Sequence, residues 1–118
     1  MIGHLSVPGF TGDLPTSLSA DTVNGLLRNE IGFGGLVFTD ALNMGAIVDN
    51  FGALDALERS FLAGADIAIL GSLGEVGPAL DHLVARAAVD PGLAGLLDER
   101  VARVMEAKGQ MTICVGAQ

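Results

Sequence analysis

Apolar residues follow two patterns along this chain, a helical spacing in longer stretches and short continuous runs between them. The helical spacing predicts helices over residues 19–31, 54–64, 75–89 and 93–105. The continuous runs predict strands over residues 2–7, 36–39 and 66–70. Because strands and helices alternate and the strands are apolar on both faces, we predict an α/β fold built on a parallel sheet.

Small and capping residues divide these elements. Ser19 is placed to cap the first helix and Gly32 to end it, while Pro91-Gly92 separates the last two helices. We predict loops over 8–18 and 41–52. The main domain is predicted over 1–109, followed by a tail over 110–118 in which "MTICV" can form an edge strand.

The net negative charge argues against two classes of binding partner, nucleic acids and anionic membranes. The 118 residues carry 14 acids and six scattered bases, a formal net charge of −8, so the basic patch typical of nucleic-acid binding is missing. An anionic membrane surface is disfavoured for the same reason, and no apolar run is long enough to span a bilayer. Met1 is not followed by the basic region of a signal peptide, which predicts a cytoplasmic protein.

The sequence also argues against a bound metal or cofactor. Its single cysteine and two distant histidines do not form a ligand pattern, so we predict neither a metal nor a cofactor. The glycines at 32, 34 and 35 follow a helix and precede a strand. A dinucleotide-binding fingerprint has the opposite order, strand first and helix second.

Asp40 is the strongest candidate for chemistry. It directly follows the apolar run Leu36–Phe38 and Thr39, and functional groups of parallel α/β folds gather at the carboxyl ends of strands. An aspartate at this place can also cap a helix or serve as a buried salt-bridge partner. The pattern alone leaves these alternatives open.

Several motifs together resemble one enzyme family. The stretch "LRNEIGFGGLVFTDALNMGAI" is similar to the nucleophile segment of glycoside hydrolase family 3, and most similar to its β-N-acetylhexosaminidase branch. "GHLSVPGF", "PTSLS", "AGADIAIL" and "LDERVARVMEAK" also resemble that family, in the same order and spacing. The resemblance extends to about Gly109.

The resemblance implies a fold and a reaction. The family fold is a (β/α)₈ TIM barrel, and the three predicted strands correspond to strands six to eight with their helices. Asp40 then ends strand seven and matches the catalytic nucleophile of a retaining glycosidase, which forms a covalent glycosyl-enzyme. The implied substrate is a carbohydrate with a terminal β-linked N-acetylhexosamine.

The chain also departs from the family. A full barrel needs about 250 residues, and neither the loop histidine nor the glutamate that serves as acid/base in the family's branches has a counterpart here. We therefore expect a fragment that lacks its acid/base. The alternative is an inactive barrel fragment that acts as a scaffold or a weak carbohydrate-binding piece. An open barrel exposes its interior, which predicts possible self-association.

Other residues near the predicted site are less specific. His4 and Met44 are candidates for substrate binding, although the pattern favours a satisfied strand histidine at His4, and Met44 can equally be a core residue. Asp13 fits a turn better than a catalytic acid. Asp66 fits a loop or capping carboxylate.

Overall fold

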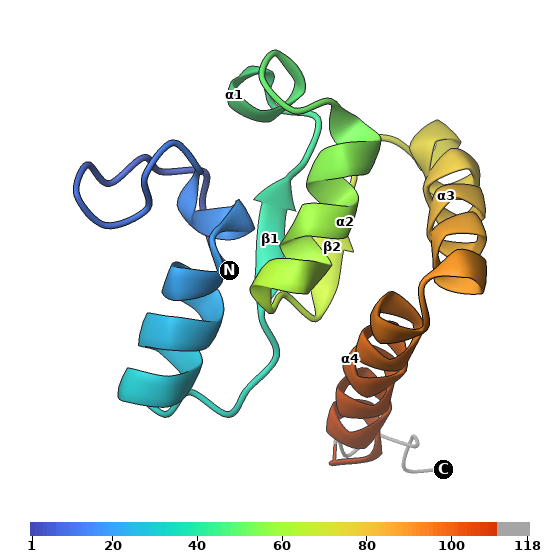
Figure 1. Ribbon diagram of the computed structural model, residues 1–118. Coiled ribbons are helices and arrows are strands. Elements are labelled where there is room, and N and C mark those ends of the chain that lie inside the picture. Colours follow the sequence, from blue (N-terminus) through green and yellow to red (C-terminus); the bar gives the residue numbers. More distant parts are fainter. Residues whose placement is uncertain (111–118) are drawn as a thin grey trace, which may run out of the picture.

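Helices lie in front of a small parallel sheet and on either side of it in the computed structural model, which describes residues 1–110 (Figure 1). The sheet consists of β1 (Phe38–Ala41) and β2 (Ile67–Ile69). The helical segments are η1 (Thr16–Leu18), η2 (Asp21–Glu30), α1 (Gly45–Val48), α2 (Ala53–Ala63), η3 (Leu73–Glu75), α3 (Val76–Val89) and α4 (Pro91–Gln110). The predicted α/β class and the parallel strand pairing are therefore confirmed.

Helix α2 is the central packing element, and in Figure 1 it lies across the two strands. One cluster of buried residues joins α2 to the loop after β1 and includes Leu42, Ile47 and Leu57. A second cluster joins the end of α2 to Val23 of η2 and to Val37, the residue before β1. Each such aliphatic side chain contributes about 1.5–3 kcal/mol when it is fully buried. The core therefore lies between the helices and one face of the sheet.

The overall shape is open. The radius of gyration is 15.2 Å, whereas a compact domain of this length has about 13 Å. Figure 1 shows α3 and α4 standing to one side of the sheet, apart from η2 on the other side. A groove of about 530 Å³ lies along α3 and α4, and it is lined mainly by apolar side chains such as Phe61, Leu83 and Leu97.

The first predicted strand is wrong in its extent. Within residues 2–7 only Ile2 pairs with β1, through a parallel bridge to Thr39. The main chain of Leu5 instead bonds with Thr16, whose N–H donates to the Leu5 carbonyl at 2.8 Å and whose Oγ1 accepts the Leu5 N–H at 3.2 Å. These bonds to the following loop turn the segment away from the sheet.

The second predicted strand is displaced by two residues. Strand β1 covers 38–41 rather than 36–39. Asp40 is therefore the next-to-last residue of the strand and does not follow it. The loop predicted over 41–52 contains the short helix α1, which begins after Met44. The third strand, β2, falls within the predicted range 66–70.

The helix boundaries follow the expected signals more closely. Helix α2 ends at Gly64, whose φ of +119° is left-handed, and a Cβ at Gly64 would overlap Asn24 of η2. Asp90 separates the last two helices, because its Oδ1 accepts the N–H groups of Gly92 and Leu93 at the start of α4. Ser19 does not cap η2 through its side chain, since Ala20 precedes that helix. The predicted edge strand lies outside the described residues.

Candidate active site

Strand β1 contains one more residue than its partner between Phe38 and Ala41, the segment that holds Thr39 and Asp40. Phe38 lies opposite Ile67 and Ala41 lies opposite Ile69, so three steps along β1 match two along β2. Such a β-bulge kinks a strand and redirects a side chain, and bulges are common beside active sites. The bulge therefore determines where the Asp40 carboxylate points.

The Asp40 carboxylate is half-buried and held by main chain. Its Oδ1 accepts the Ala41 N–H at 2.8 Å, and the Asp40 N–H donates to the Ile2 carbonyl, also at 2.8 Å. Within residues 1–110, no lysine, arginine or histidine nitrogen lies in salt-bridge range of Asp40, and Oδ2 accepts no hydrogen bond. The second carboxylate oxygen is therefore available to a reactant at the carboxyl end of the strand.

His4 lies beside the same strand end and uses both ring nitrogens. Nε2 lies 3.0 Å from the Ala41 carbonyl, which can only accept, so Nε2 carries a hydrogen. Nδ1 lies 2.6 Å from Oγ of the buried Ser17 and accepts its hydroxyl hydrogen when the ring is neutral. The structure therefore brings His4 and Asp40 to neighbouring positions, with Ala41 between them.

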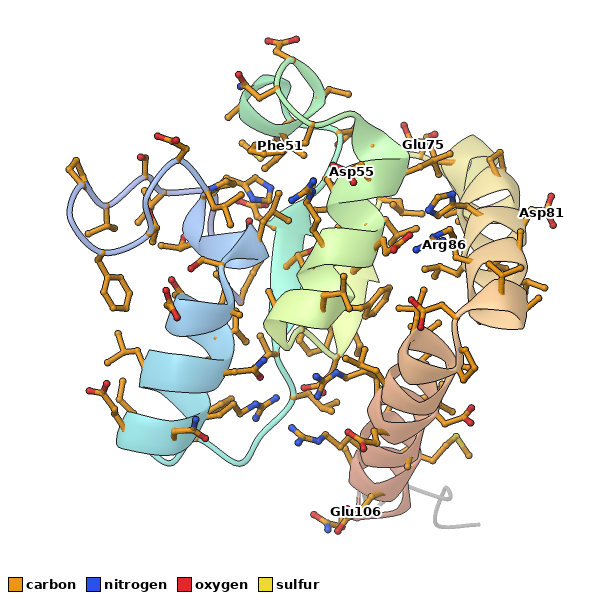
Figure 2. The ribbon with its side chains drawn as sticks, viewed as in Figure 1. Phe51, Asp55, Glu75, Asp81, Arg86 and Glu106 are labelled. Carbon is orange, nitrogen blue, oxygen red and sulfur yellow. The ribbon has the colours of Figure 1, made fainter. Side chains whose placement is uncertain are left out.

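A cleft opens next to His4. It has a volume of about 450 Å³, and its polar lining includes His4, Asp13 and Asn50. The ring of Phe51 forms part of its wall; Figure 2 shows Phe51 between α1 and α2. Carboxylate, amide, imidazole and aromatic groups together suit a polar ligand with one apolar face.

Met44 and the loop around it are exposed. The Met44 side chain is 45% exposed and precedes α1, so it is not a core residue of the described structure. Its neighbour Asn43 lies against the loop after β2, where a Cβ at Gly71 would overlap the Asn43 amide. The loops that follow β1 and β2 are therefore in close contact.

A different cluster occupies the opposite end of the sheet, where Asp66 precedes β2. Its side chain is fully buried, and Arg28 donates to Oδ2 at 2.6 Å. The Val37 N–H donates to the same oxygen at 2.8 Å. Guanidinium nitrogens of Arg100 and Arg103 each lie 3.9 Å from Oδ1. Asp66 lies in the bend before β2, as predicted for a loop carboxylate, but the sequence did not reveal its ion pairs with arginines.

Arginines give this cluster its structural role. Arg28 also donates to the carbonyls of Phe33 and Gly35, at 2.8 and 2.6 Å, and so fixes the chain between η2 and β1. Burial lowers the pKa of the Arg100 guanidinium, and the negative charge of Asp66 opposes this effect. Spacing alone does not reveal the cluster, because its members come from 28, 66, 100 and 103.

A second ionic cluster joins α2 to α3. Arg86 lies between these helices in Figure 2, and its Nε and Nη2 donate to the two oxygens of Glu58 at 2.9 and 3.0 Å. His82 Nε2 lies 3.2 Å from the same carboxylate. The hydrogen bond from Arg86 holds the pKa of Glu58 below its usual value.

The described residues contain neither a cluster of metal-ligating side chains nor a helix suited to crossing a membrane. Among residues 1–110, no group of three or more histidine, cysteine, aspartate or glutamate side chains is arranged to hold a metal ion. No helix in that part of the chain combines the length and apolar character needed to cross a bilayer.

Comparison with known sequences gives a consistent result. The family described as "Glycosyl hydrolase family 3 N terminal domain" matches residues 1–107. Beta-hexosaminidase LpqI of Mycobacterium tuberculosis is 42% identical over 120 residues, covering 97% of this chain and 31% of that protein. The Mycobacterium bovis protein of the same name matches equally. The chain thus spans about a third of the length of these curated relatives.

Solved structures support the same relationship. A glycosyl hydrolase of the GH3 family from Mycobacterium smegmatis superposes with a TM-score of 0.79 at 44% identity, over 87% of this chain and 33% of that one. Mycobacterium tuberculosis LpqI gives 0.76 at 46% identity, over 88% and 32%. A β-N-acetylglucosaminidase from Paenibacillus gives 0.75 at 35% identity, over 89% and 20%.

Proposed function

Because the chain belongs to glycosyl hydrolase family 3, we propose that it carries the nucleophile of a retaining β-N-acetylhexosaminidase and that this nucleophile is Asp40. The observation that carries the proposal is the carboxylate's setting. Asp40 lies at the carboxyl end of a parallel strand, with one oxygen held by Ala41 and no cationic partner among residues 1–110. The names of the relatives, beta-hexosaminidase and β-N-acetylglucosaminidase, suggest the substrate class.

The reaction proceeds in two displacements. Asp40 Oδ2 attacks the anomeric carbon of the sugar, and the bond from that carbon to the glycosidic oxygen breaks. A second group protonates the departing oxygen and then removes a proton from water. The water attacks the same carbon and releases the Asp40 carboxylate, so the product keeps the original configuration. The fixed Oδ1 lowers the entropy cost of placing Oδ2 for attack.

We further propose that these elements are the sixth to eighth βα units of a (β/α)₈ barrel. The bridge at Ile2, strand β1 and strand β2 lie side by side in that order, which is the order of adjacent barrel strands. Asp40 is then at the catalytic end of the barrel, and Asp66 is at the opposite end, where side chains serve stability.

The remaining catalytic parts are proposed to come from outside these 118 residues, because the chain covers 31% of the length of LpqI. These parts include the acid/base. The assignment of His4 and Met44 to substrate binding remains a prediction. The two hydrogen bonds of His4 favour a supporting role, in which the ring fixes the Ala41 carbonyl beside the nucleophile.

The test uses a substrate that does not need the acid. Dinitrophenolate leaves readily without protonation, so a dinitrophenyl β-N-acetylglucosaminide isolates the nucleophilic step. We would assay the 118-residue chain and a chimera in which it replaces the matching third of Mycobacterium tuberculosis LpqI. Asp40→Asn is compared with Asp13→Asn, which changes a carboxylate in the neighbouring cleft.

We expect the chimera to hydrolyse this substrate and Asp40→Asn to lose at least a thousandfold in kcat/KM, about 4 kcal/mol in barrier height. Asp13→Asn is expected to keep most of the activity. Equal rates for the chimera and its Asp40→Asn variant would contradict the proposal. Turnover by the chimera but not by the separate chain would show that the site needs the rest of the barrel.

A second candidate role is a scaffold that associates with itself. Large apolar side chains on α3 and α4 are exposed, including Val84 at 69% and Val89 at 74%. Exposed patches of this kind favour association. We expect the separate chain to be oligomeric in light scattering, and a monodisperse monomer that melts cooperatively would contradict this role.

A further inference from the structure

We propose that Thr39 is a positioning residue for Asp40, because its hydroxyl closes the bulge in β1 and thereby fixes the direction of the carboxylate. The inference rests on the proposed role of Asp40 as nucleophile. It adds a residue whose side chain faces the neighbouring strand and has no need to touch the sugar.

The hydroxyl replaces a main-chain partner that the bulge removes. Ile69 N–H donates to Thr39 Oγ1 at 3.0 Å, while the Ile69 carbonyl accepts the Leu42 N–H at 2.9 Å. In a regular parallel pair both groups of Ile69 would bond to the main chain of β1. The side chain of Thr39 therefore occupies the place of the missing carbonyl.

Burial makes this hydrogen bond important. Thr39 is 1% exposed, so water has little access to take over the Ile69 N–H. A buried donor without an acceptor destabilises the folded state. A valine at position 39 preserves the size of the side chain but leaves the Ile69 N–H without an acceptor, and the strand relieves this by changing its register or relaxing the bulge.

The other edge of β1 is held as well. Ile2 N–H donates to the Phe38 carbonyl and Asp40 N–H donates to the Ile2 carbonyl, both at 2.8 Å. The peptide units before and after Thr39 are thus both held by the main chain of Ile2. The Ala41 N–H then holds Asp40 Oδ1 at 2.8 Å. Among these contacts, the bond from the Ile69 N–H has a side-chain acceptor that belongs to a residue other than Asp40. A substitution at Thr39 can therefore remove this bond and leave Asp40 unchanged.

A change of register has a large effect on the carboxylate. Side chains alternate between the two faces of a strand, so a slip by one residue moves Asp40 to the opposite face. A smaller relaxation of the bulge still displaces the oxygen that attacks, and a misplacement of about 1 Å can cost a hundredfold in rate. The hydroxyl of Thr39 therefore contributes to the rate without contacting the reacting atoms.

The test compares Thr39→Val and Thr39→Ser with the matched control Thr22→Val. Thr22 Oγ1 is buried and has no hydrogen-bond partner among residues 1–110, so its removal leaves no donor unpaired. Amide exchange at Ile69 is measured in the 118-residue chain. Steady-state kinetics with the dinitrophenyl substrate are measured in the LpqI chimera.

We expect Thr39→Val to raise the exchange rate at Ile69 and to lower kcat by about tenfold to a hundredfold, with KM changed less than threefold. Thr39→Ser retains the hydroxyl and is expected to restore both values. Thr22→Val is expected to change neither. If the valine protein does not fold, Thr39→Ala takes its place with the same two readouts.

Two results would overturn the inference: an Ile69 amide that stays protected without the Thr39 hydroxyl, or a kcat that stays unchanged although protection is lost. Failure of the proposed function has a different signature. In that case the unsubstituted chimera and its Asp40→Asn variant turn over equally, while exchange at Ile69 still shows whether Thr39 holds the bulge.

Discussion

The two ends of the small sheet place an aspartate in opposite surroundings. At one end Asp66 is fully buried, with an arginine at 2.6 Å and two more at 3.9 Å. At the other end Asp40 is half-buried and held only by main-chain hydrogen bonds. A carboxylate surrounded by cations is fixed and unreactive, whereas one with a free oxygen can react. The difference separates a stabilising aspartate from a candidate catalytic one, although both adjoin a strand.

The largest expected effect comes from Asp66. Asp66→Ala leaves three arginines without their shared counter-charge and removes the acceptor of the Val37 N–H. Breaking a buried pair in this way costs about 3–5 kcal/mol. Chemical unfolding monitored by circular dichroism should therefore show a severe loss of stability. A loss below about 1 kcal/mol in the free energy of unfolding would mean that Asp66 is not the stabilising aspartate that the comparison with Asp40 requires.

Arg28→Lys should have the next largest effect. A lysine supplies one point charge and cannot reach Asp66 and the carbonyls of Phe33 and Gly35 with the planar fork of an arginine. We expect a loss of about 2 kcal/mol in the free energy of unfolding. Arg59→Lys is the matched control, because the exposed pair of Arg59 with Asp55 is worth less than about 1 kcal/mol. Equal losses in the two variants would contradict the account.

The pH dependence of stability should reveal the contact between α2 and α3. Since Arg86 lowers the pKa of Glu58 in the folded chain, the unfolded chain binds the proton more readily. The stabilising contribution is therefore present above the usual glutamate pKa of 4.5 and is lost as the pH falls below it. Glu58→Gln should reduce this acid-side loss in thermal melts recorded from pH 3 to 6, whereas an unchanged profile would argue against it.

The smallest expected change in stability comes from Asp40→Asn. The asparagine has the same shape, its Oδ1 can still accept the Ala41 N–H, and no cation in the described part of the chain loses a partner. We expect the free energy of unfolding to change by less than about 0.5 kcal/mol, as for surface substitutions. A loss comparable to that of Asp66→Ala would mean that Asp40 is structural too.

The sequence predicts the helices well because each has its own local signals. Gly64 and Pro91 mark helix boundaries that the structure confirms within one or two residues. The strand over 2–7 is wrong because the bonds between Leu5 and Thr16 are not visible in an apolar pattern. The bulge at Thr39 escapes prediction as well, since it depends on the register against a strand 30 residues away.

In the candidate site, too, local sequence signals could be predicted and contacts between distant residues could not. The motif around Asp40 is local, so the sequence alone could single it out as a candidate. The partners of His4 and Asp66 come from distant parts of the chain, and only the folded structure brings them together. Two aspartates next to strands therefore look alike in sequence and differ in three dimensions.

Mass spectrometry of the chimera after rapid acid quenching tests the central claim most directly. With the dinitrophenyl β-N-acetylglucosaminide present, we predict a gain of one N-acetylhexosaminyl unit on the peptide that contains Asp40. The gain should be absent from Asp40→Asn and present in Asp13→Asn. Turnover that continues in Asp40→Asn, or a sugar attached to another residue, would contradict the assignment of Asp40 as the nucleophile.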